Sequence, residues 1–74
     1  MNERIRDIVT REAVNGTVNY QQHEGIYLIR EYIKDVKGVT PPEFTVGGSM
    51  LEAMLFEKAL TAALMHFADR INNK

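Results

Sequence analysis

The chain has 74 residues, which suffice for one domain with a modest core, and it contains no cysteine. Disulfides and cysteine-ligated zinc or iron–sulfur sites are therefore excluded, and a chain of this size hides only roughly 60% of the surface that its unfolded form exposes. Nine Lys and Arg residues stand against ten Asp and Glu residues. Proteins that bind duplex nucleic acid normally carry an excess of basic residues. The near-neutral net charge therefore argues against general nucleic-acid binding.

The first segment, residues 2–14, predicts a short helix. Its apolar residues fall on one helical face, and they are Ile5, Ile8, Val9 and Ala13. Asn15 and Gly16 end the helix, because both tolerate the left-handed conformation that closes helices. The charged first residues lead into no unbroken apolar run, so we expect no secretory signal.

A second helix is predicted from about Tyr20 to Lys37, with Asn19 as its N-cap and Gln22 positioned to complete a capping box. One apolar seam follows alternating spacings of three and four, and it consists of Ile26, Ile29, Ile33 and Val36. Gly25 weakens the first turns. Gly38 and the two following prolines end the helix.

A loop with two prolines and two glycines follows, and we expect its Phe44 to pack back onto the core. Ser49 and Glu52 then form a Ser-x-x-Glu capping box directly before an apolar run, which is a specific signal for a helix start. The third helix is predicted from Met50 to about Asn72, roughly 34 Å at 1.5 Å per residue.

This third helix is apolar on every side, since fourteen of the nineteen residues 50–68 are apolar. Such a helix must be surrounded, and the two shorter helices cannot surround it. Its span also contains four ionisable residues, which exclude a bilayer crossing, and these are Glu52, Glu57, Lys58 and His66. We therefore expect a cytoplasmic, all-α single domain of residues 1–74. It consists of a short N-terminal helix and a long antiparallel helical hairpin, and it is homo-oligomeric through the third helix.

Catalytic motifs are absent from the sequence: no nucleophile elbow, phosphate-binding loop, dinucleotide-binding pattern or zincin pattern occurs. His66 stands three residues before Asp69, which could orient it as a general base, but this spacing is common on helices. We interpret both histidines, His23 and His66, as surface or interface residues. We therefore expect that the protein is not an enzyme and that it binds no cofactor and no metal.

The segment Thr45-Val46-Gly47-Gly48-Ser49 is the better candidate for a site, because free backbone N–H groups at a helix start favour anions. Cations on the second helix would approach this turn, and tyrosines could stack on a base. The candidate ligand-binding residues are Tyr27, Arg30, Lys34, Lys37, Thr45, Gly47, Gly48 and Ser49. The structural alternative is that the glycines form a turn, the serine is a cap and the lysines complement the helix dipole.

The third helix resembles that of small phage proteins that sequester cyclic-oligonucleotide signals, the anti-CBASS and anti-Thoeris nucleotide sponges. The resemblance is carried, without gaps, by Glu52, Leu55, Leu60, Ala63, Leu64, Met65 and Ile71. The predicted order of a brief helix, a long helix, a Pro-bearing loop and a second long helix agrees with it. The resemblance implies a homo-oligomeric, non-enzymatic binder of cyclic or ADP-ribose-type nucleotides that acts in infected bacteria.

Two other functions stay open. The main alternative is a small helical regulator that docks its apolar third helix on a host or partner protein and blocks it. A dimeric DNA-binding regulator would need a basic recognition face, and only the first helix, with Arg4, Arg6 and Arg11, comes near to one.

Overall fold

The computed structural model describes residues 2–15 and 21–72, and for residues 12–15 the backbone alone. It contains three helices: α1 (Glu3–Asn15), α2 (Gln22–Lys37) and α3 (Met50–Asn72). No strand occurs among these residues, so the all-α prediction is confirmed. None of the helices, over the residues described, is both long and apolar enough to span a bilayer.

Asn2 starts α1 rather than lying within it. Its side-chain oxygen accepts a hydrogen bond of 2.9 Å from the backbone N–H of Ile5, which is the geometry of an N-cap. Its side-chain nitrogen donates to the Tyr27 hydroxyl at 2.8 Å, so the cap also ties α1 to α2. The predicted apolar face is confirmed at Ile5, Ile8 and Val9, which are all buried. Ala13 lies within α1, where the structure describes its backbone alone, and Gly16 lies outside the described residues.

The start of α2 differs from the prediction. The N-cap is Gln21, whose backbone is extended and whose side chain makes no capping hydrogen bond. Gln22 is therefore the first helical residue, and it does not complete a capping box. The expected N-cap, Asn19, lies outside the described residues.

The end of α2 and the start of α3 were both predicted correctly. Gly38 takes the left-handed conformation, with φ of 72°, and its N–H donates to the Lys34 carbonyl oxygen at 2.9 Å. At α3, the Glu52 N–H donates to the Ser49 hydroxyl at 3.1 Å, which makes Ser49 the N-cap. Local hydrogen bonding thus fixes both ends of the connecting loop.

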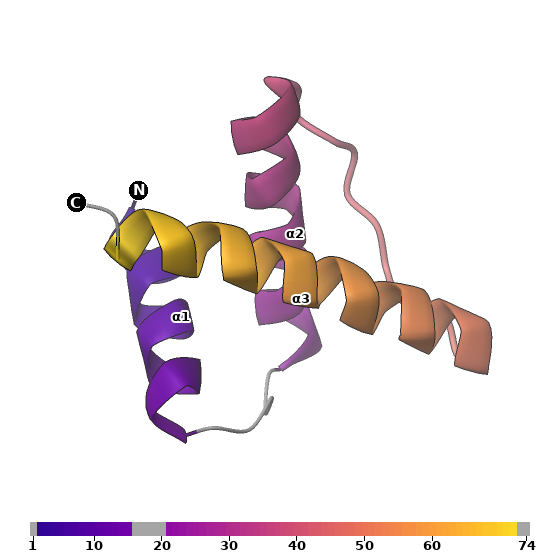
Figure 1. Ribbon diagram of the computed structural model, residues 1–74. Coiled ribbons are helices and arrows are strands. Elements are labelled where there is room, and N and C mark those ends of the chain that lie inside the picture. The colour runs from indigo at the N-terminus through magenta and orange to yellow at the C-terminus, as the bar shows by residue number, and fades with distance from the viewer. Residues whose placement is uncertain (1, 16–20, 73–74) are drawn as a thin grey trace.

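The arrangement of the helices differs from a long antiparallel hairpin. In Figure 1, α1 and α2 lie on the same side of α3, which crosses both steeply, and the first turns of α3 extend past α2. The seam predicted along α2 is therefore covered only in part: Ile29 is buried, whereas Val36 is 54% exposed. A steep crossing produces this pattern because two crossed helices touch over only a few turns.

One glycine of α2 lies directly under a side chain of α3. Gly25 is buried, and a Cβ atom added there would lie 2.5 Å from Cζ of Phe56. The missing side chain lets the Phe56 ring rest on the α2 backbone. Gly25 thus weakens the helix locally while allowing the close approach of α3.

The hydrophobic core lies between α3 and the layer formed by α1 and α2. Its buried residues come from all three helices, and they are Ile5, Ile8, Val9, Leu28, Ile29, Leu60, Ala63 and Phe67. Phe44 packs against this cluster, as predicted. Only one face of α3 contributes buried residues, so its opposite face stays in solvent.

Candidate functional site

The predicted ligand residues on α2 do not converge on one place. Tyr27 accepts a hydrogen bond from Asn2, and the Arg4 guanidinium lies 4.0 Å from the centre of its ring. One ring face is thereby covered by a cation–π contact within the chain. Tyr27 thus serves the junction between α1 and α2, two turns or more before the lysines at the end of α2.

Arg30 does reach the connecting loop, but through other loop residues than predicted. Its Nη2 donates to the Pro41 carbonyl oxygen at 3.0 Å, and its Nη1 lies 3.9 Å from a carboxylate oxygen of Glu43. Lys34 pairs with Glu31 one turn before it, at 3.3 Å, and Lys37 is exposed. Among the residues that the structure describes, no hydrogen bond or ion pair joins Lys34 or Lys37 to the turn before α3.

The turn before α3 holds a carboxylate of its own. Thr45, Gly47, Gly48 and Ser49 are all exposed, and neither glycine has a positive φ. The Glu52 side chain folds back so far that a Cβ atom on Gly47 would collide with its carboxylate. An anion at this turn would therefore meet the Glu52 carboxylate, and either that side chain turns away or the two charges repel.

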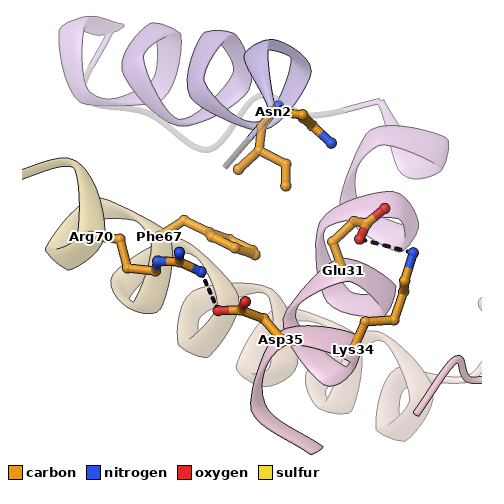
Figure 2. Close-up of a pocket in the computed structure, with 7 residues that line it drawn as sticks. Asn2, Glu31, Lys34, Asp35, Phe67 and Arg70 are labelled. Atoms are coloured by element: carbon orange, nitrogen blue, oxygen red, sulfur yellow. Dashed lines mark hydrogen bonds and ion pairs between the residues drawn. The ribbon is translucent and has the colours of Figure 1, made fainter. Parts of the chain in front are cut away.

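A cleft of about 280 Å³ lies between the first residues of α1, the second half of α2 and the end of α3. Figure 2 shows Phe67 facing this cleft, with charged side chains from α2 and α3 around its rim. The charges are paired: Lys34 with Glu31 at 3.3 Å, and Arg70 with Asp35 at 2.5 Å. Because both cations already have carboxylate partners, the cleft has little attraction for either an anion or a cation.

Asp35 is the centre of a cluster that sequence spacing missed. Its Oδ2 contacts Nε2 of His66 at 2.6 Å as well as Nη1 of Arg70, and both partners come from α3. The hydrogen bond from His66, followed by that from Arg70, lowers the pKa of the Asp35 carboxyl below its ordinary value. His66 is thus held by Asp35 and not by Asp69, which the spacing along α3 would also allow. No local signal could reveal a pair that stands 31 residues apart in the chain.

The His66 ring is also fixed by aromatic neighbours. Its centre lies 5.1 Å from both the Tyr32 and the Phe67 rings, and both pairs are edge-on. No group of three or more potential metal-binding side chains occurs in the described part of the chain. The contacts of Asp35 with His66 and Arg70 join α2 to α3 as a polar clamp. A second clamp joins α1 to α2, where Arg11 contacts Glu24 at 2.7 Å and its hydrogen bond lowers the Glu24 pKa.

The largest unexplained surface is the outer face of α3. Five long apolar side chains there are 57% to 80% exposed, and they are Met50, Leu51, Met54, Leu55 and Met65. At 100° per residue these positions point away from the buried Leu60, Ala63 and Phe67. This set, which we call the outer face, also contains the exposed Ala62. The sequence predicted apolar residues on all sides of α3, and the structure identifies which of them the chain leaves uncovered.

Comparison of the chain with protein-family models, with curated proteins and with solved structures finds no match. The resemblance to the nucleotide sponges therefore stays a prediction from the sequence.

Proposed function

We propose that the chain is a cytoplasmic, non-enzymatic binding protein that works as a homo-oligomer, with the outer face of α3 as the contact between copies. One observation carries the proposal: five large apolar side chains of one helix are more than half exposed. Burying one such side chain fully contributes about 1.5–3 kcal/mol, so covering this face contributes roughly 5–10 kcal/mol per copy before the costs of association.

The shape of the outer face favours a second copy of α3 as its occupant. The face is a narrow strip along one helix, and from Met50 to Met65 it is about 23 Å long at 1.5 Å per residue. Contiguous exposed apolar patches larger than a few hundred Å² are rare on monomers and mark interaction sites. A second α3 has the same length and the same apolar residues, so pairing two copies covers both strips at once.

Substitutions on the outer face test this proposal without disturbing the core. Leu60 and Ala63 are unsuitable, because both are buried within the chain and their charged variants would unfold it. Met54→Glu places a charge at a side chain that is 60% exposed. Thr10→Glu, at an exposed position of α1, is the matched control.

We expect the wild-type chain and Thr10→Glu to form dimers or larger oligomers in sedimentation equilibrium at micromolar concentration. Met54→Glu should be monomeric and keep the wild-type helical circular dichroism. A wild-type chain that stays monomeric over this range would overturn the proposal and leave the outer face to a different partner protein, as in the blocking regulator.

We further propose that the oligomer binds a signalling nucleotide. Lys37, which is exposed at the end of α2, supports it, whereas Lys34 already has Glu31 as a partner at 3.3 Å. Carboxylates contact two other residues of the expected ligand site. Glu43 lies beside the Arg30 guanidinium, and the Glu52 side chain lies against Gly47. Nucleotide binding at this place would therefore require those side chains to move.

A further inference from the structure

We infer that Met50, Met54 and Met65 form a site of reversible oxidation, where a peroxide converts the thioethers to sulfoxides and thereby separates the copies of the chain. This inference rests on the self-association proposed above. The three residues are the methionines of α3, and all of them belong to its outer face, with exposed fractions of 80%, 60% and 64%. They supply three of the five large apolar side chains of that face.

The core differs from the outer face in composition. Its buried side chains, over the part of the chain that the structure describes, are those of isoleucine, valine, leucine, alanine and phenylalanine, and none of them contains sulfur. The fourth methionine of the chain, Met1, lies outside the described residues. A reaction at sulfur on α3 therefore alters the surface proposed for contact between copies and leaves the buried core of the single chain as it is.

The methionines of α3 are open to a dissolved oxidant in the separated copy. Each is more than half exposed, and the chain has no cysteine that would compete for the oxidant. A sulfur lone pair bonds to one oxygen of hydrogen peroxide and the O–O bond breaks. The leaving hydroxide takes the proton of the transferred OH group and becomes water. Each sulfur is thus oxidised by two electrons, and each peroxide is reduced by two.

A sulfoxide puts a polar oxygen where self-association needs an apolar side chain. Burying such a group without a hydrogen bond is unfavourable, and the neighbouring Leu51 and Leu55 have no hydrogen to donate. The Thr61 hydroxyl, one turn before Met65, already donates to the Glu57 carbonyl oxygen at 2.9 Å. The oxidised face is therefore better solvated in the separated copy, and mass action shifts the equilibrium toward that copy.

The reaction can be reversed without new synthesis of the chain. Methionine sulfoxide reductases return a sulfoxide to the thioether. A dithiol supplies the two electrons and two protons, is itself oxidised to a disulfide, and the oxygen leaves as water. Oxidation and reduction would thus set the fraction of associated chain.

A leucine variant separates the sulfur chemistry from any other effect of peroxide. Met50→Leu, Met54→Leu and Met65→Leu together keep the face apolar and nearly conserve side-chain volume, and they remove the three sulfur atoms. All three side chains are exposed in the single chain, so the triple variant should keep the fold. Met1 is present in both proteins, so its oxidation cancels in the comparison.

The test compares sedimentation equilibrium before and after treatment with hydrogen peroxide. We expect the wild type to gain one oxygen at each of positions 50, 54 and 65, assigned by mass spectrometry of peptides, and to keep its helical circular dichroism. Its dissociation constant for self-association should rise at least about tenfold. A methionine sulfoxide reductase with dithiothreitol should restore the starting constant. The triple leucine variant should associate before treatment and keep its constant afterwards.

Polar variants test the consequence without an oxidant. Met54→Gln with Met65→Gln replaces two thioethers by amides of similar length, and this double variant should also raise the constant at least about tenfold. Thr10→Gln, at an exposed position of α1, is the matched control and should leave it unchanged. A double variant with the wild-type constant would contradict the effect of polarity on which the inference depends.

The outcomes separate this inference from the self-association itself. An oxidised wild type that associates as tightly as before, as when Lys58 on the same face donates to the sulfoxides, would overturn the inference and leave self-association intact. Equal dissociation of the leucine variant, loss of helical circular dichroism on oxidation, or sulfoxide at Met1 alone would do the same. An untreated wild type that is monomeric would overturn self-association and this inference with it.

Discussion

Substituting Gly25 tests the crossing that leaves the outer face of α3 uncovered. In an exposed helix, Gly→Ala stabilises by about 1 kcal/mol, because alanine restricts the unfolded chain and favours the helix. Here the new Cβ atom would lie 2.5 Å from Cζ of Phe56, closer than carbon atoms approach without contact strain. Forcing a methyl group into a packed contact typically costs about 1–3 kcal/mol.

The clash outweighs the gain in helix propensity, so Gly25→Ala should destabilise the chain by about 1 kcal/mol. Removing the ring reverses the sign: in a Phe56→Ala background, Gly25→Ala should stabilise by about 1 kcal/mol, because only the propensity effect is left. The coupling between the two positions is then about 2 kcal/mol, within the range measured for residues in contact.

Urea unfolding followed by circular dichroism measures all four proteins of this cycle. One protein concentration must be used throughout, since self-association makes the transition depend on concentration. If Gly25→Ala stabilises the wild type and the Phe56→Ala background equally, α3 does not pass over Gly25, and the assignment of the outer face fails with it.

Three further predictions follow from the loop, the polar clamp and the expected ligand site. Gly38→Ala should lower the stability by about 1 kcal/mol in thermal melts, because Gly38 has a φ of 72°, whereas Gly48→Ala, where nothing lies within 4 Å and φ is not positive, should have little effect. Because the Asp35 pKa is lowered in the folded chain, its carboxylate contributes stability above the ordinary aspartate pKa of about 4, and this contribution is lost as the pH falls through the lowered value. Asp35→Asn should therefore be less stable than the wild type at pH 7, with a smaller difference at pH 3 in urea unfolding. If the oligomer binds a phosphorylated nucleotide near Lys34 and Lys37, a hundredfold excess over Kd should stabilise it by about 2.7 kcal/mol, and Lys34→Glu with Lys37→Glu should abolish the thermal shift; a screen of cyclic dinucleotides and ADP-ribose derivatives without any shift would refute this.

The parts of the fold that local sequence determines were predictable. Ser49 stands directly before an apolar run and Gly38 directly after an amphipathic one. Each makes the hydrogen bond that caps its helix, so the start of α3 and the end of α2 could be predicted from local sequence. The spacing of Ile5, Ile8 and Val9 likewise identified the buried face of α1. These signals involve residues within one or two helical turns, where chain geometry leaves few alternatives.

The direction in which α3 crosses α2 could not be predicted from local sequence. Gly25 looked like a weak point of α2, and only its contact with Phe56, 31 residues later, explains why a glycine suits this position. Asp35 and His66 are a similar case, since spacing along α3 pointed to Asp69 instead. Helix periodicity tells which face is apolar, but the crossing of two helices depends on the side chains that meet there.

The expected ligand site shows the same limit for charges. The cations of α2 and the glycines before α3 were visible in the sequence, and so were the carboxylates, but their pairing was not. Arg30 reaches Glu43 across the loop, and Glu52 folds back onto Gly47. A cation that already has a carboxylate partner offers less to an anionic ligand, so net positive charge at a site must be judged from the folded contacts.

The steep crossing explains why α3 needs apolar residues on two opposite sides. A hairpin would align α2 with α3 along its length, whereas crossed helices share only a few turns. The buried residues that α3 contributes to the core are therefore limited to Leu60, Ala63 and Phe67. The residues on the other side of α3 do not stabilise the single chain, yet they are as apolar as those in the core. Solvent-exposed methionine and leucine at five positions of one face lower solubility, and this cost is the physical reason for the self-association proposed above.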